Sequence, residues 1–287
     1  MNIVDMRLRP PTKNWIGKPQ YKEGMPDVPT RIGFPRAPSA EQRSIKLLLS
    51  EMDQAGIKWG VAMGRKSAEP LGKVSNEEIV EVIAQYPDRF VSFVGIDISQ
   101  PTEVCIAEID RFMKVKGFVG VSTEPCASDT PMHCDDKRLY PIYELCQSRD
   151  IPISLSLSTL LSFMVGASHE YSSPLSLYQV ARDFPKLDIV ISHGAWPWVR
   201  EILGVAFICP RIWVSPDLYM VGTNIPGAEE YFKATNMYLS NRMLFGTAYP
   251  SRPLVESVKE FNKWSFDPGV KEKVLSRNAL RLMRMAD

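Results

Sequence analysis

Short apolar runs alternate with longer amphipathic stretches along the whole chain. Most of the apolar runs end near a glycine, a proline or a charged turn, which is typical of strands buried in a sheet. Eight runs fit this description: residues 3–8, 59–63, 90–96, 117–121, 153–157, 189–192, 212–214 and 243–245. The pattern therefore predicts eight strands.

The stretches between these runs carry apolar residues at three- and four-residue spacing, which indicates amphipathic helices. The clearest are residues 40–55, 76–86, 102–113, 140–148 and 173–184. Eight strands, each followed by a helix, in a chain of 287 residues predict an α/β protein, a parallel (β/α)8 TIM barrel. A doubly wound open sheet is the second possibility. No linker or repeat divides the chain, so we expect a single domain over residues 1–287.

Two proline-rich insertions are too long to be ordinary connections. One covers residues 10–38, after the first strand, and the other covers residues 123–139, after the fourth. Loops that follow barrel strands lie at the face where barrel enzymes place their active sites. We therefore expect both insertions to cover that face.

The composition of the chain limits the classes of partner that it can bind. The chain has 34 basic and 33 acidic residues, a net charge of +1, and no basic run typical of nucleic-acid or membrane binding. It also lacks a stretch of the roughly 20 apolar residues that a membrane span needs. We expect a cytoplasmic protein with a small-molecule partner. The five cysteines form no Cys-x-x-Cys pair and are predicted to be reduced and buried; a metal cluster of Cys126 and Cys134 around His133 fits no zinc spacing.

His193 is the first candidate for chemistry. The apolar run before it ends at Ile191, and Ser192, His193 and Gly194 follow at once. Such a strand delivers the imidazole to the carboxyl edge of the sheet, where α/β proteins place their active sites. A purely structural histidine, bonded to a backbone carbonyl, is the alternative.

Longer tracts resemble a known family. Residues 184–198 read FPKLDIVISHGAWPW and residues 244–250 read LFGTAYP, with further similarity at 136–143 and 276–282. These tracts, in this order, resemble the amidohydrolase-related family that includes aminocarboxymuconate-semialdehyde decarboxylase. The resemblance implies a (β/α)8 barrel and an activity among metal-dependent hydrolases and nonoxidative decarboxylases.

The chain departs from this family at the positions where the resemblance implies metal ligands. Arg7 and Arg9 stand where the family has the two histidines of its first strand, and serines follow the fifth strand, with Ser156 on the expected face. Ala248 replaces the aspartate after the eighth strand. Of the implied ligand set, only His193 remains.

Arginine stays protonated and cannot coordinate a cation, but its forked N–H groups suit a carboxylate or a phosphate. Strand alternation places Asp5, Arg7 and Arg9 on one face, with Val4, Met6 and Leu8 on the other, and the resemblance implies that the first face points inward. We therefore predict an anion site in place of the metal, which Arg65 and Arg252 are placed to join. The alternative is a buried ion network in which Asp5 pairs with Arg7 or Arg9.

Two further carboxylates follow strands. Glu124 comes after the fourth strand and Asp217 after the seventh. Either carboxylate, if near His193, would orient the ring or act as a general acid or base. The alternatives are that Glu124 bonds a loop arginine and that Asp217 caps a helix.

Together these residues suggest a hydrolase that acts on a small carboxylate-bearing lactone or ester, with no cofactor expected. His193 would move a proton, with Asp5 or Glu124 as its partner. The residues expected to bind substrate are Arg7, Arg9, Arg65, Arg252, Ser156 and Asp217.

Two other readings stay open. In one, Asp5, Glu124, His193 and Asp217 bind a single zinc or manganese ion, for hydrolysis or decarboxylation. In the other, the protein is a noncatalytic binder of an anionic metabolite. The resemblance also makes a homodimer possible.

Overall fold

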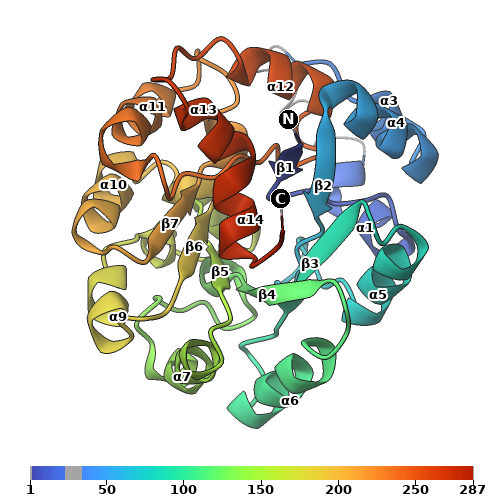
Figure 1. The fold of residues 1–287 in the computed structure, drawn as a ribbon. Helices are drawn as coiled ribbons and strands as arrows, with labels where there is room; N and C mark the ends of the chain where they lie inside the picture. Colours follow the sequence, from blue (N-terminus) through green and yellow to red (C-terminus); the bar gives the residue numbers. More distant parts are fainter. Residues whose placement is uncertain (1, 23–33, 287) are drawn as a thin grey trace.

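The computed structural model describes residues 2–22 and 34–286, in which seven parallel strands pair in chain order. The strands are β1 (Ile3–Asp5), β2 (Ile57–Val61), β3 (Phe90–Gly95), β4 (Phe118–Thr123), β5 (Ile153–Ser156), β6 (Ile189–Ser192) and β7 (Ile212–Ser215). Figure 1 shows the sheet curling on itself, with the helices on its outside.

Residues 243–245 close the sheet between β7 and β1. The Leu244 N–H donates to the Val214 carbonyl at 2.9 Å, and the Met6 N–H donates to the Phe245 carbonyl at 2.9 Å. The eighth strand predicted here is thus reduced to isolated bridges and is not a regular strand. The closing segment (residues 243–245) nevertheless occupies the eighth position, and the predicted (β/α)8 barrel is confirmed.

Helices follow the strands as the amphipathic pattern predicts. The longer ones are α4 (Ile45–Ala55), α5 (Asn76–Gln85), α6 (Thr102–Phe112), α7 (Tyr140–Ser148), α8 (Thr159–Met164), α9 (Leu177–Asp183), α10 (Val199–Ile208), α11 (Ala228–Ala234) and α12 (Leu254–Phe261). The helix predicted over 40–55 is divided, with the short α3 (Pro38–Glu41) before α4. Ser44 causes the division, because its hydroxyl caps α4 by accepting from the Leu47 N–H at 3.3 Å.

The barrel interior has its own apolar cluster, to which strands on opposite sides of the barrel contribute. Val4 and Met6 belong to this cluster, together with Phe93 from β3 and Trp213 from β7. The alternation that placed Val4 and Met6 outside is therefore wrong, whereas Leu8 does pack with the outer core. Val4 and Met6 share one face, as alternation requires, but that face is the inner one; the alternation is lost before Leu8 because β1 ends at Asp5.

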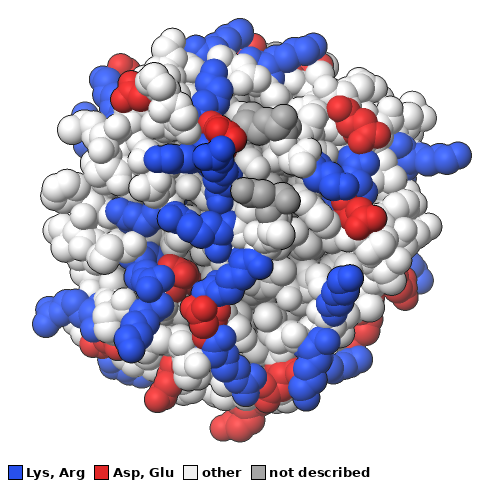
Figure 2. All heavy atoms as spheres, viewed as in Figure 1, with Lys and Arg blue, Asp and Glu red and all other residues white. Residues whose placement is uncertain are grey.

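Helix α14 (Asn278–Leu282) seals the end of the barrel opposite the carboxyl ends of the strands, as Figure 1 shows. Its Ala279, Leu280 and Leu282 join the interior cluster. Lysine and arginine side chains gather around α14 on this face (Figure 2). Several pair internally, since Arg284 contacts Asp150 and Arg211 contacts Asp188. We read this basic surface as structural.

Within residues 2–22 and 34–286, no helix combines the length and the apolar character that crossing a membrane requires. All five cysteines are buried free thiols, as predicted.

The seal formed by α14 can be tested by truncating one of its side chains. Leu282 is 1% exposed, so Leu282→Ala should lower the free energy of unfolding by about 2–5 kcal/mol through lost burial and a cavity. Leu175→Ala is the matched control, because Leu175 is 52% exposed and its truncation should change stability by less than about 0.5 kcal/mol. Urea denaturation of both variants measures the difference. Equal stability of the two would show that α14 does not seal the interior.

Candidate active site

Buried polar side chains converge where the strands end. They come from β1, β4, β5, β6 and β7, from the loop after β2 and from the chain after the closing segment. The set is Asp5, Arg7, Arg9, Arg65, Glu124, Ser156, His193, Asp217, Thr247 and Arg252, all of them buried. The carboxyl ends of the strands thus form one polar centre, where barrel enzymes carry out their chemistry.

Glu124 ties two arginines together. Its Oε1 accepts from Arg7 Nη2 at 2.7 Å and from Arg65 Nη2 at 3.2 Å, and Ser67 donates to its Oε2. Burial acts to raise the pKa of Glu124, but Arg65 and Arg7 outweigh it and lower the pKa to about 2. Glu124 is therefore ionised at neutral pH, and its single charge is shared by two guanidinium groups.

Among the residues that the structure describes, no guanidinium group contacts Asp5. Its Oδ1 accepts from the backbone N–H groups of Arg7 and Thr247, both at 3.0 Å, and its Oδ2 accepts from Thr247 Oγ1 at 2.6 Å. The alternative in which Asp5 pairs with Arg7 or Arg9 is wrong; Glu124 is the carboxylate that pairs with Arg7. Burial, with a smaller contribution from Asp217, raises the pKa of Asp5 to about 7 against these hydrogen bonds.

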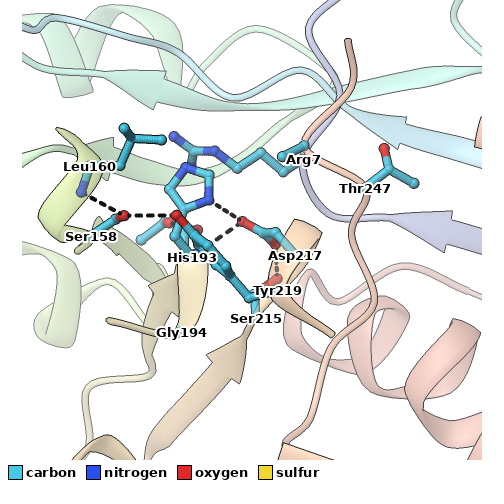
Figure 3. A network of polar contacts seen from close by, with 12 residues as sticks. Arg7, Ser158, Leu160, His193, Gly194, Ser215, Asp217, Tyr219 and Thr247 are labelled. Carbon is cyan, nitrogen blue, oxygen red and sulfur yellow. Dashed lines mark hydrogen bonds and ion pairs between the residues drawn. The ribbon is translucent and has the colours of Figure 1, made fainter. Parts of the chain in front are cut away.

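His193 lies against Asp217. The ring Nδ1 is 3.2 Å from Asp217 Oδ2, which also accepts from the His193 backbone N–H at 3.0 Å, while Ser215 Oγ donates to Oδ1 at 2.6 Å (Figure 3). Asp217 is therefore the carboxylate beside His193, and the expectation that Asp5 or Glu124 partners the ring is wrong. Both His193 and Asp217 have positive φ, at 64° and 53°. These backbone turns bring the two residues together.

The imidazole is neutral at neutral pH. Burial is the main cause that lowers the pKa of His193, to about 4, and the positive charge of Arg7 adds to it, while Asp217 acts in the opposite direction. Figure 3 shows the Arg7 guanidinium beside the ring. With its Nδ1 toward Asp217, the ring has Nε2 left as the nitrogen that can meet a substrate or a water molecule.

Three of the buried arginines retain N–H groups without a partner in the described structure. In Arg7, Arg65 and Arg252 these groups are Nε and Nη1. Arg9 differs, because it donates to the carbonyl oxygens of Ala248 at 2.7 Å and Tyr249 at 3.2 Å. Arg9 thus holds the chain after the closing segment, and the other three arginines are the candidates for binding an anion.

The described parts of both insertions pack on this centre, as predicted. The Trp15 ring lies 5.4 Å from the Arg65 guanidinium carbon, and the Phe34 ring lies 4.8 Å from that of Arg252. In the second insertion, the Ala127 carbonyl accepts from the Ala68 N–H at 2.9 Å, beside Ser67. Residues 23–33 of the first insertion lie outside the described residues.

Several site residues escaped the sequence analysis. Thr247 donates to Asp5 and Ser67 donates to Glu124. Tyr219 places its hydroxyl 3.1 Å from Ser158 Oγ and its ring edge-on to His193. Their positions just after strands were the available signal. Ser156 is buried at the end of β5, where Cys126 Sγ donates to its carbonyl oxygen at 3.4 Å.

The donor set does not fit a divalent metal. In residues 2–22 and 34–286, no group of three or more His, Cys, Asp or Glu side chains is placed to hold an ion. Glu124 is bonded to two arginines and Asp217 to Ser215 and His193. Fixed guanidinium charges beside these carboxylates would repel a cation.

The fold and this centre define a (β/α)8-barrel protein with a buried site, rich in arginine, at the carboxyl ends of its strands. A family model described as "Amidohydrolase" matches residues 4–285. The chain belongs to this amidohydrolase family.

Solved structures share this fold. An uncharacterised TIM-barrel protein from Bordetella bronchiseptica is 38% identical, with a TM-score of 0.91 and 99% of each chain covered. A probable 2-pyrone-4,6-dicarboxylic acid hydrolase from Acinetobacter baumannii, solved with citric acid bound, shares the fold at 14% identity, with a TM-score of 0.68 over 99% of this chain and 100% of the other.

Curated relatives are more distant. Gamma-resorcylate decarboxylase from Rhizobium sp. is 19% identical over 258 residues, 77% of this chain and 78% of its own. The enzyme of the same name from Rhizobium radiobacter is 26% identical over 95 residues, which are only 29% of its length. A dihydroxybenzoic acid decarboxylase from Polaromonas, solved with manganese and an inhibitor, shares the fold at 18% identity, with a TM-score of 0.67 over 99% of this chain and 97% of the other.

The contact between His193 and Asp217 depends on a glycine. A Cβ atom at Gly246 would stand 2.6 Å from Asp217 Oδ1, so Gly246→Ala should displace this carboxylate. Because Asp217 raises the pKa of His193, its displacement should lower that pKa further. NMR titration of the three histidines measures the shift.

Gly204→Ala, in α10, is the control. Its new Cβ would have its nearest neighbour, Tyr178 OH, at an ordinary 3.6 Å. A His193 titration in Gly246→Ala that matches both Gly204→Ala and the wild type would contradict the role given to Asp217.

Proposed function

We propose that this protein hydrolyses a lactone or an ester of a small carboxylate-bearing molecule without a divalent metal. The observation that carries the proposal is the neutral His193 ring, backed by Asp217 and flanked by the Arg7 guanidinium. This arrangement provides a proton acceptor, a carboxylate to stabilise its protonated form and a cation for developing negative charge.

The reaction follows from these positions. His193 Nε2 accepts a proton from a water molecule as the water oxygen bonds to the acyl carbon, and the carbonyl π electrons move to its oxygen. Asp217 stabilises the imidazolium that forms. When the tetrahedral intermediate collapses, the bond to the alkoxide oxygen breaks, and that oxygen takes the proton from His193. The products are an acid and an alcohol, joined in one molecule when the substrate is a lactone.

Arginine N–H groups supply the electrostatic part of this mechanism. Arg7 Nε and Nη1 have no protein partner in the described structure, and they are buried. Donors fixed in a water-poor site stabilise an oxyanion far better than donors in water, by about 3–4 kcal/mol for a single donor in known hydrolases. In this proposal Arg7 meets the developing oxyanion, while Arg65 and Arg252 bind carboxylate groups.

Nonoxidative decarboxylation is the second candidate, because both curated relatives are named gamma-resorcylate decarboxylase. In that reaction an acid protonates the ring carbon that bears the carboxylate, and the C–C bond then breaks to release CO2 and restore the aromatic ring. Asp5 is the acid suited to this step, since its pKa of about 7 leaves it partly protonated at neutral pH. Release of CO2 from hydroxybenzoates by the purified protein would identify this decarboxylase activity.

Replacement of His193 tests the hydrolase. His193→Gln should lower kcat/KM for a cleaved lactone by about 100-fold or more, and His133→Gln, at an exposed histidine, should leave it unchanged. In the wild type, kcat/KM should fall below pH about 4, because protonated His193 accepts no further proton.

Other outcomes contradict this proposal. A fall in kcat/KM below pH about 7 that is absent from the Asp5→Asn variant would identify Asp5 as the base. A confirmed turnover that survives His193→Gln would exclude His193. Binding of carboxylates with no turnover across lactones, esters and hydroxybenzoates would leave a noncatalytic binder.

Metal content is a separate prediction. Protein purified without added metal or chelator should contain well below one transition-metal ion per chain, by elemental analysis, because arginines stand at two of the ligand positions that the family resemblance implies. Its activity should also survive dialysis against a chelator. Stoichiometric zinc or manganese, lost together with activity on chelation, would contradict the proposal.

A further inference from the structure

Positive charge exceeds negative charge in the buried centre. Arg7 and Arg65 share the one carboxylate of Glu124. No described carboxylate lies within ion-pairing distance of Arg252, although this side chain is only 1% exposed. A buried charge without a partner is costly, so proteins retain one mainly where a ligand supplies the opposite charge.

Arg252 forms one of two groups of unpartnered donors. Its Nη2 donates to the Leu218 carbonyl at 3.3 Å, whereas Nε and Nη1 have no partner. One face of the guanidinium lies 4.8 Å from the Phe34 ring, which shields it from water. Burial lowers the pKa of Arg252 to about 10, which leaves it protonated at neutral pH. The first group therefore has fixed charge and free donors.

Arg7, Arg65 and Trp15 form the second group. Nε and Nη1 of both arginines are buried without partners, and so is the indole Nε1 of Trp15. The three side chains are neighbours, because the arginines share Glu124 and the Trp15 ring lies 5.4 Å from the Arg65 guanidinium carbon. All of these unpartnered atoms are donors, so the group suits an acceptor with negative charge.

Contacts connect His193 to both groups. Arg7 lies beside its ring on one side (Figure 3). Tyr219, which meets the ring edge-on with centroids 6.4 Å apart, follows Leu218, whose carbonyl accepts from Arg252. A molecule that reached both groups would therefore pass near the imidazole.

We propose that the substrate is a dianion with two carboxylates, one bound by Arg65 and Trp15 and the other by Arg252, which leaves Arg7 for the developing oxyanion. The bond that reacts lies between them, next to His193; this last point rests on the proposed hydrolase function, whereas binding of the two carboxylates does not. Membership of the family does not by itself specify such a charge.

Calorimetry at constant ionic strength tests the dianion, with the 1,2-, 1,3- and 1,4-isomers of phthalate as probes. Each isomer is compared with its own monomethyl ester, which keeps the shape and removes one charge. At least one isomer should bind about tenfold or more tightly than its ester, since a buried bidentate contact is lost with the second carboxylate. Failure of all three isomers to do so overturns the proposal.

Arg252→Gln locates the second carboxylate. In this variant the preference for the dianion should fall to about twofold or less, with affinity for the monoester little changed. The Arg252→Lys variant should keep part of the preference for the dianion, because lysine keeps the positive charge but lacks the paired N–H groups of the guanidinium. Arg211→Gln, at a half-exposed arginine on the opposite face, should keep the full preference. An unchanged preference in Arg252→Gln would overturn the assignment.

The readouts separate this proposal from the hydrolase. Circular dichroism of each variant establishes that it is folded before titration. Cleavage of monocarboxylate lactones by a protein without dianion preference would retain the hydrolase and reject the dianion. Tight binding of a dianion with no cleavage of any lactone or ester would retain the dianion site and reject the hydrolase.

Discussion

One carboxylate shared between two buried arginines governs this site. Glu124 is long enough to reach both Arg7 and Arg65, and its charge neutralises only one of them. The uncompensated charge favours the neutral form of His193, and it leaves N–H groups free for an anion. Because Glu124 follows β4 while the arginines follow β1 and β2, the arrangement requires a barrel with its strands in chain order.

Much of the fold could be predicted because buried parallel strands are continuous apolar runs. The failures occur where a few local hydrogen bonds replace a regular ladder. Residues 243–245 close the barrel through isolated bridges. An apolar run in the sequence does not indicate whether its residues form a regular strand or only such bridges. Val4 and Met6 keep the alternation but on the inner face, and the alternation breaks only after Met6, where the Arg7 N–H donates to Asp5 Oδ1 and Leu8 packs in the outer core.

The location of the site was predictable, but its pairings were not. A residue that follows an apolar run lies at the carboxyl edge in any parallel barrel, which is why His193, Glu124 and Asp217 were found. Which carboxylate meets the imidazole depends on positive φ values at His193 and Asp217, and these have no signature in side-chain chemistry. Thr247 was missed for the related reason that threonine after a strand is common and uninformative.

Exchanging metal ligands for arginines changes how a hydrolase can work. A metal lowers the pKa of bound water and supplies hydroxide at neutral pH, whereas a guanidinium holds anions but does not ionise water. In the proposed hydrolase, His193 must therefore activate the water, and its pKa of about 4 makes it a weak base. Burial also strengthens each charge around it, so Asp217 can stabilise the imidazolium and Arg7 the oxyanion as they form. A base of this kind suits lactones and activated esters, whose leaving groups depart easily, better than amides.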